Sequence, residues 1–184
     1  MFNWLSARKA HRATVETVYE AVIASARRPE LYRDVNVPDT TEGRYEMVVV
    51  HLVIVLERLR AEGDATAPLS RDLIERFVID MDDCMREIGV GDLSVPKKVR
   101  RAAAGLWERA ELYRPSLGPS GDRAALARAL AEAMAGLPDA EDPAVSPTPI
   151  DFAALAADLA TINDRVAATP LDRLLAGAPL APDA

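Results

Sequence analysis

The nearly unbroken apolar segment from Tyr45 to Leu56, in which valine recurs, constrains the fold of this chain more than any other feature. Such a run is compatible with a buried strand or with a buried helix. It continues directly into the charged sequence 57–62 and ends at Gly63, a residue type that commonly follows the last turn of a helix. We therefore predict a single helix over Thr41–Glu62. Because this helix is apolar on nearly every side, we expect it to lie at the centre of a bundle.

Helical spacing also governs the segments on either side of this run. Apolar residues three or four positions apart form one stripe in Val15–Ile23 and another in Leu73–Ile88, and each stripe predicts a helix. We expect Ser70 to cap the second of these helices. A further helix is predicted to open at Ser94–Pro96 and to close at Pro115. No segment alternates apolar and polar residues in the way of a half-buried strand. The fold class that we predict is all-α.

The composition changes near residue 114, and this change suggests how the chain is organised. Residues 1–114 contain eight of the nine aromatic residues and every lysine, whereas residues 115–184 contain nine of the thirteen prolines. Later helices are predicted over 125–134, from a start at Thr148–Pro149 to Val166, and from Thr169–Pro170 to Leu175. We therefore expect a compact helical bundle with additional C-terminal helices. Its parts are a basic and aromatic N-terminal segment (1–11), a helical core (12–114) and an Ala/Pro-rich helical extension (115–184).

The charge and the cysteine content exclude several classes of function. With a formal net charge of −7, the chain is a poor general nucleic-acid binder, because phosphate contacts need a basic surface. Its single cysteine, Cys84, cannot form an internal disulfide or a thiolate zinc site, and it fits a reducing compartment. We find no run of about 18 apolar residues and no secretory signal. We therefore expect a soluble bacterial protein of the cytoplasm.

An acidic cluster on the helix predicted over 70–88 leaves two interpretations open. Carboxylates three or four residues apart share a helix face, so Asp80, Asp83 and Glu87 together could hold a divalent metal. The chain would then be a helical metal-dependent enzyme. Alternatively, the carboxylates form a salt-bridged face that serves recognition, because Arg86 lies within pairing reach. We favour recognition and expect no metal, since no second acidic helix accompanies the first.

No set of catalytic side chains accompanies this cluster. His51 lies inside the apolar helix, where a buried imidazole is usually a core group, and His11 is the only other histidine. Cys84 lies on the apolar face of its helix and has no convincing base beside it in the sequence. We therefore expect neither an enzymatic activity nor a cofactor.

The most specific local feature is the turn from Gly89 to Lys98. Its glycines and lysines could cradle an anion at the N-terminus of the following helix. They could equally form a helix end at Gly89, a tight turn at Gly91 and a cap at Ser94. The second interpretation leaves a run of cations unexplained, and a basic face on an acidic chain favours an anionic partner or a membrane surface. These cations are Lys97, Lys98, Arg100 and Arg101.

The first twelve residues offer a second surface of this type. Apolar anchors next to cations suit a lipid interface. The segment contains both, with Phe2, Trp4 and Leu5 followed by Arg8, Lys9 and Arg12.

Several motifs follow one another in a specific order. The first is Val37–Glu46, and His51–Leu52 follows it. The acidic sequence Asp80–Asp83 with Arg86–Glu87 comes next, and the turn Gly89–Lys98 completes the set. In this order and spacing the motifs resemble the ubiquinol–cytochrome c chaperone family. The resemblance covers residues 12–114 well and extends more loosely to Gly177.

This resemblance implies an α-helical chaperone, not an enzyme, that binds newly made cytochrome b. Such a chaperone aids the biogenesis of ubiquinol–cytochrome c reductase. By analogy with mitochondrial members, the resemblance also implies a small partner protein and a ribosome contact, while contact with a membrane would be peripheral. A membrane- or ribosome-associated adaptor without chaperone activity is the other interpretation that we keep open.

The motifs point to two groups of functional residues. One group is expected to contact partners, and the other to shape turns and helix ends. The partner-binding group is Asp82, Asp83, Arg86, Glu87, Asp92, Lys97, Lys98 and Arg101. The structural group is Asp39, Gly43, Arg44, His51, Gly89, Gly91 and Pro96.

Overall fold

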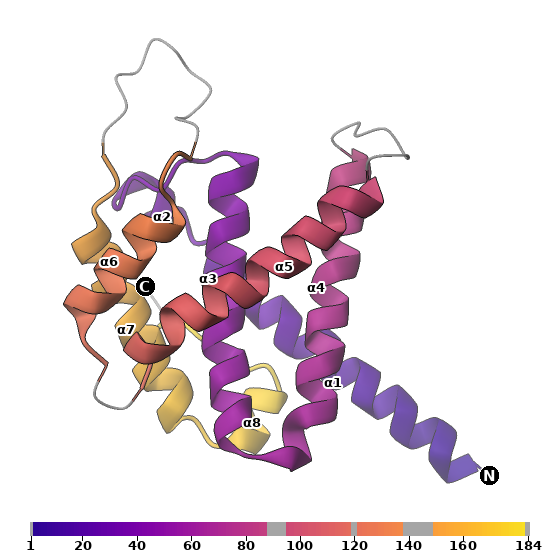
Figure 1. Cartoon of the computed structure of the whole chain (residues 1–184). Coiled ribbons are helices and arrows are strands. Elements are labelled where there is room, and N and C mark those ends of the chain that lie inside the picture. The colour runs from indigo at the N-terminus through magenta and orange to yellow at the C-terminus, as the bar shows by residue number, and fades with distance from the viewer. Residues whose placement is uncertain (1, 88–94, 119–120, 138–148, 183–184) are drawn as a thin grey trace.

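A computed structural model describes residues 2–87, 95–118, 121–137 and 149–182, and for residues 2, 3, 5, 85–87, 95–99 and 102 it describes the backbone alone. All regular structure in these ranges is helical, which confirms the predicted all-α fold class (Figure 1). None of the helices in these ranges is long and apolar enough to cross a membrane. The elements are α1 (Phe2–Ala26), α2 (Pro29–Arg33), α3 (Thr41–Ala61), the 3₁₀ turn η1 (Asp64–Thr66), α4 (Ala67–Glu87), α5 (Val95–Tyr113), the 3₁₀ turn η2 (Arg114–Ser116), α6 (Arg123–Ala133), α7 (Phe152–Ala168) and α8 (Leu171–Leu175).

The helix α3 occupies the centre of the bundle, as its apolar sequence predicts. Every residue from Glu46 to Val55 is buried, so this helix meets neighbours on all its sides. The helices that pack against it are α1, α4, α5 and α7. In Figure 1, α3 runs through the middle of the molecule, with α4 to one side, α6 and α7 to the other, and α5 crossing in front of it. An isolated helix of this composition would expose far too much apolar surface to persist in water.

Local chemistry defines both ends of α3. At the start, the Thr40 hydroxyl oxygen accepts a hydrogen bond from the backbone N–H of Gly43 at 3.1 Å, which satisfies one of the unpaired amides of the first turn. At the end, Gly63 adopts a φ of 83°, a left-handed conformation that favours glycine. The observed bounds, Thr41–Ala61, agree with the predicted helix to within one residue.

The predicted start of α4 at Ser70 is wrong, because α4 begins at Ala67, directly after η1. The Thr66 hydroxyl donates to the carbonyl oxygen of Leu59 at 2.6 Å, and this bond turns the chain back along α3. Pro68 then occupies the first turn of α4, where its missing N–H costs no hydrogen bond. Ser70 therefore lies inside the helix and does not cap it.

The C-terminal helices share the core of the bundle. Leu130 of α6 and Leu159 of α7 are buried in the same apolar cluster as the residues of α3. Arg28, just after α1, donates to the carboxylate of Asp158 on α7 at 3.2 Å, which ties the two ends of the chain together. The division of the chain at residue 114 stays a prediction, and the helices on both sides of it contribute to one core.

Replacing Leu52 by Ala should lower the free energy of unfolding by about 2–5 kcal/mol, because the truncation leaves a cavity at the centre of the bundle. Leu52 is 0% exposed. The matched change Leu56→Ala should cost less, since Leu56 is only partly buried. Urea denaturation of both variants measures the difference, and equal losses would contradict the central position of this part of α3.

Candidate functional site

An apolar groove of about 490 Å³ lies between α3, α4 and α5. The C-terminal end of α3, the turn η1, the N-terminal half of α4 and the C-terminal half of α5 all contribute to its lining. Trp107 of α5 is 57% exposed at this groove, which is unusual for so large an apolar side chain. The other apolar residues of the lining are Leu56, Ala67, Ile74, Leu106 and Ala110.

Charged side chains also line the groove, and most of them pair with one another. Glu57 accepts a hydrogen bond from Arg60 at 2.8 Å and another from Arg114 at 2.9 Å. Its side chain is only 13% exposed, so two guanidinium groups compensate a largely buried carboxylate. Arg71, on α4, is exposed. An apolar centre with polar neighbours is the usual anatomy of a surface that binds another protein.

A buried ion pair holds α5 in the position that forms this groove. Arg109 donates to the two carboxylate oxygens of Glu46 on α3, at 3.0 and 2.7 Å. It also donates to the carbonyl oxygen of Ala133, the last residue of α6, at 2.7 Å. The Glu46 side chain is only 4% exposed, so its charge depends on this single guanidinium for compensation. Arg109 lies two residues after Trp107, and the pair therefore fixes the part of α5 that lines the groove.

The acidic cluster of α4 is partly used by the fold itself. Asp80 accepts a hydrogen bond from the Tyr19 hydroxyl at 3.0 Å and lies 3.7 Å from the guanidinium of Arg76. Burial, together with the neighbouring Asp80 carboxylate, raises the pKa of the Tyr19 hydroxyl, which stays protonated as the donor. Arg76 also stacks on the Tyr19 ring at 4.9 Å and pairs with Glu16 at 2.9 Å. Asp80 thus helps to join α4 to α1.

The remaining predicted recognition residues lie near the far end of α4 and the start of α5. Asp82 is partly buried, while Asp83 and Arg101 are exposed. Among the described side chains, no three His, Cys, Asp or Glu residues are grouped as a metal site requires. The side chains of Arg86, Glu87, Pro96, Lys97 and Lys98, and all of Gly89, Gly91 and Asp92, lie outside the described parts of the chain.

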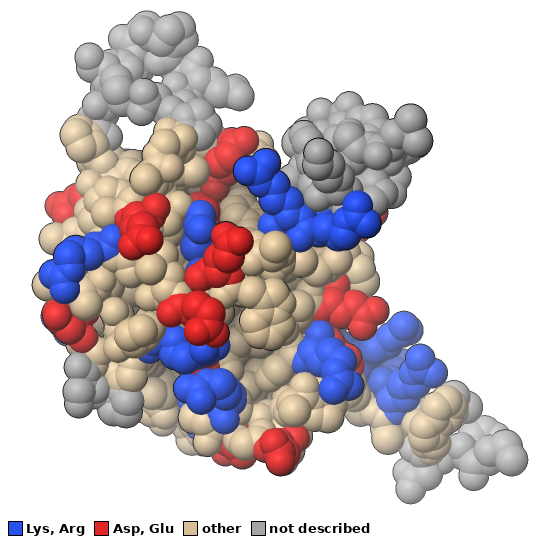
Figure 2. Space-filling model, viewed as in Figure 1, with Lys and Arg blue, Asp and Glu red and all other residues tan. Residues whose placement is uncertain are grey.

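The first turns of α5 nevertheless present a basic surface. Arg100 and Arg101 are both exposed there. Figure 2 shows basic side chains gathered at this end of α5, on the same face of the molecule as α4. The surface and the groove thus share one helix, with cations near its start and Trp107 in its second half.

The residues predicted to shape the approach to α3 lie close together. Asp39 accepts a hydrogen bond from Arg44 at 2.6 Å, across the first turn of the helix. Gly43 packs so closely on the preceding chain that a Cβ atom there would lie 2.0 Å from the carbonyl oxygen of Pro38. Only glycine tolerates this approach, which places Thr40 for its capping hydrogen bond.

His51 is a core residue and faces none of the surfaces described above. Its Nδ1 atom lies 2.7 Å from the carbonyl oxygen of Met47, which identifies Nδ1 as the protonated donor of a neutral ring. Burial lowers the pKa of His51 to about 4. Its Nε2 atom has no hydrogen-bond partner among the described residues.

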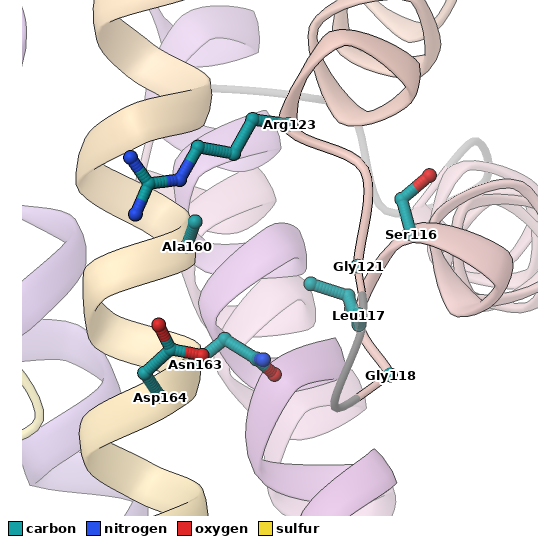
Figure 3. A pocket seen from close by; sticks show the side chains of 8 residues that line it. All are labelled: Ser116, Leu117, Gly118, Gly121, Arg123, Ala160, Asn163 and Asp164. Carbon is teal, nitrogen blue, oxygen red and sulfur yellow. The ribbon is translucent and has the colours of Figure 1, made fainter.

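A second, more polar pocket of about 300 Å³ lies where the turn before α6 meets α7 (Figure 3). Arg123 of α6 and Asn163 and Asp164 of α7 surround it. A tight turn forms one wall of this pocket. The turn is so close that a Cβ atom at Gly121 would lie 2.2 Å from the carbonyl oxygen of Ser116. No buried charged side chain lines this pocket within the described ranges, and we therefore take the apolar groove as the candidate site.

Sequence reasoning missed the two features that define the groove. Most of the surface of Trp107 is exposed, which the apolar spacing of its helix did not indicate. Glu46 offered a signal, because a carboxylate inside an otherwise apolar helix needs a cationic partner from another element. The identity of that partner, Arg109, depends on which helix crosses α3 at this height, and the sequence pattern does not contain that information.

Comparisons with known proteins agree with the resemblance seen in the motifs. The model of the family described as "Ubiquinol-cytochrome C chaperone" matches residues 33–181. Among solved structures, the crystal structure of the Cbp3 homolog from Brucella abortus is similar, with a TM-score of 0.78 and 32% sequence identity. That match covers 100% of this chain and 97% of the other. No curated protein matches the sequence.

Arg109→Ala should lower the free energy of unfolding by about 3–5 kcal/mol, because it leaves the buried carboxylate of Glu46 uncompensated. The control is Arg44→Ala, which breaks an ion pair whose side chains are 60% and 55% exposed. Exposed pairs of this kind contribute about 0–1 kcal/mol. Chemical denaturation measures both variants, and a small loss for Arg109→Ala would refute the structural role of the Glu46 pair.

Stability should fall as the pH drops from about 6.5 to about 4, because the unfolded chain binds a proton at His51 that the folded core excludes. The stabilisation that comes from keeping His51 neutral is fully present above pH 6.5, the ordinary pKa of histidine. Between pH 6.5 and pH 4 the free energy of unfolding should fall by about 3 kcal/mol. His51→Gln should flatten this part of the stability profile, measured by denaturation at a series of pH values. An unchanged slope would contradict the neutral, buried state of His51.

Proposed function

This chain belongs to the ubiquinol–cytochrome c chaperone family, and we propose that its client is newly made cytochrome b. The family supports a chaperone role in the assembly of ubiquinol–cytochrome c reductase. In this proposal the chaperone holds cytochrome b until it is built into the reductase. We assign the chain no catalytic reaction and no cofactor, in keeping with a chaperone family.

The apolar groove beside Trp107 is the observation that carries this proposal. A newly made membrane subunit has helices with long apolar surfaces, which associate wrongly when they are left in water. A groove of about 490 Å³ can take up several apolar side chains from one such helix. An exposed tryptophan beside an apolar depression is also the type of residue that commonly dominates the energy of a protein interface.

The charged residues of the groove support the same interpretation. The pairing of Glu57 with Arg60 and Arg114 compensates the largely buried carboxylate that an incoming apolar helix would cover, while the Asp64 carboxylate is exposed at the lining. Burying an unpaired charge under a client would cost several kcal/mol, at roughly the level seen for broken buried pairs. An apolar segment can therefore cover Glu57 without that penalty.

We extend the proposal to a second contact surface around the turn between α4 and α5. It comprises the acidic residues of α4 and the basic residues of α5 that sequence reasoning selected. Charge reversal at Lys97 and Lys98 should weaken client capture most at low salt, and unchanged capture would remove this surface from the proposal. The residues are Asp82, Asp83, Arg86, Glu87, Asp92, Lys97, Lys98 and Arg101.

The proposal also includes the setting in which the chaperone works. We place it in the bacterial cytoplasm, in peripheral contact with the inner face of the plasma membrane, where cytochrome b is inserted. A small partner protein and the ribosome are further contacts that the family resemblance suggests. The adaptor interpretation, in which the chain only recruits other factors, differs in predicting no direct capture of cytochrome b.

Trp107→Ala should reduce the capture of cytochrome b by roughly thirtyfold or more, as expected for the loss of an interface hot spot of about 2 kcal/mol. The measurement is affinity purification of the full chain from its native cell, followed by quantification of cytochrome b and of assembled reductase. Ile79→Ala is the control, because Ile79 is also a large, exposed apolar residue but lies outside the groove.

Two outcomes would contradict the proposal in different ways. If Trp107→Ala captures cytochrome b as well as Ile79→Ala and the parent protein do, the groove is not the binding site. If the parent protein captures no cytochrome b at all, the proposed client is wrong and the adaptor interpretation gains support.

A further inference from the structure

The first turns of α1 extend away from the body of the protein. In Figure 1 this part of the helix projects past α4 into solvent. Trp4, residues 6–10, Arg12 and Ala13 are all exposed, and Val15 is the first buried residue among the side chains of α1 that the structure describes. Among the same side chains, the one nearest the start of α1 that bonds to another element is His11, which lies 2.7 Å from Asp72 of α4.

The chemistry of this segment differs from that of the rest of the chain. The whole sequence has a formal net charge of −7, yet Arg8, Lys9 and Arg12 occur before the first acidic residue, Glu16. Figure 2 shows basic side chains gathered on the projecting part of the molecule. Trp4 is 64% exposed, and the guanidinium carbon of Arg8 lies 5.6 Å from the centroid of its ring. A large apolar ring and three cations are thus presented together, without neighbouring carboxylates in the segment.

The spacing of these groups along the helix matches the layers of a membrane surface. With a rise of 1.5 Å per residue, Arg8 and Lys9 lie about 6–8 Å along the axis from Trp4, and Arg12 about 12 Å. Tryptophan prefers the boundary between headgroups and hydrocarbon, while arginine and lysine pair with phosphate groups just outside it. A helix that dips this segment into the surface satisfies the ring and the cations at the same time.

An apolar groove of another protein is a less suitable binding partner for this segment than a lipid surface. A helix that binds in an apolar groove presents an uncharged apolar stripe at positions i, i+3, i+4 and i+7. Here Trp4 and Arg8 are four residues apart on one face, and the guanidinium covers the ring. A cation on the would-be apolar face is costly in a dry interface but is accommodated at a wet, anionic lipid surface.

We propose that the projecting segment of α1 binds membranes that contain anionic phospholipid, with Trp4 at the lipid interface and Arg8, Lys9 and Arg12 on the lipid phosphates. This inference deepens the peripheral membrane contact of the proposed function, because it names the surface and the lipid chemistry. The groove beside Trp107 shares no residue with the segment, so the chaperone can be tethered to a membrane while its client site stays open.

The test is cosedimentation of the full chain with vesicles of phosphatidylcholine, alone or mixed with phosphatidylglycerol. The chain should bind the mixed vesicles, bind phosphatidylcholine far less, and lose binding as salt is raised. Arg8→Gln with Lys9→Gln should lower the partition coefficient by about thirtyfold, the effect of removing two cations near an anionic surface. The matched control is Arg27→Gln with Arg173→Gln, which removes two exposed cations elsewhere and should leave binding within about twofold.

Fluorescence gives a second measurement on the same protein. In a Trp107→Phe background the only remaining indole is Trp4, and its emission should shift to the blue on mixed vesicles and not on phosphatidylcholine. Equal binding to both lipids, an equal loss in the two glutamine variants, or an unshifted Trp4 emission would each overturn the proposal. Self-association of the chain that disappears in Arg8→Gln with Lys9→Gln would also overturn it, in favour of contact with a second copy.

These outcomes are independent of the client proposal. The Arg8→Gln with Lys9→Gln variant should capture a detergent-solubilised cytochrome b as well as the parent does, whereas Trp107→Ala should lose that capture and keep its vesicle binding. Failure of the lipid test therefore leaves the client site untouched, and failure of client capture leaves the lipid contact untouched.

Discussion

Arg109 donates to both carboxylate oxygens of Glu46 and to the backbone carbonyl of Ala133, so a single guanidinium joins α5 to α3 and to the end of α6. Because the Glu46 carboxylate is almost fully buried, moving α5 away from α3 would leave its charge uncompensated in an apolar interior. This constraint fixes the angle at which α5 crosses the bundle. The groove depends on it, since Trp107 lines the groove only while α5 lies across α3 and α4.

The two proposed contact surfaces differ in the forces that they use. The groove offers apolar area around the paired carboxylate of Glu57, which suits a dry contact with an apolar helix. The projecting segment of α1 offers a ring and exposed cations, which suit a wet and anionic surface. The groove contact depends on the hydrophobic effect and the α1 contact on electrostatic attraction. Raising the salt concentration should therefore weaken binding through α1 much more than binding in the groove.

Most helices of this fold could be predicted because their apolar residues repeat with the helical period, as in Val15–Ile23 of α1. Helix starts were less predictable, since several polar residues can act as caps and packing selects among them. Asp151 caps α7 by accepting from the N–H of Ala154 at 2.9 Å, whereas the predicted start at Thr148–Pro149 lies partly outside the described residues. The five-residue helix α2 was not predicted.

The sequence by itself determined that this chain is helical, that the segment around Val53 is central and that the family is one of chaperones. Periodicity and motif order are local properties, and they can be read without knowing which helices touch. Only the tertiary structure decided that Trp107 is exposed, that Glu46 pairs with Arg109 and that α1 projects beyond the body. Each of these depends on the angle and height at which helices far apart in the chain cross, and no sequence pattern specifies that geometry.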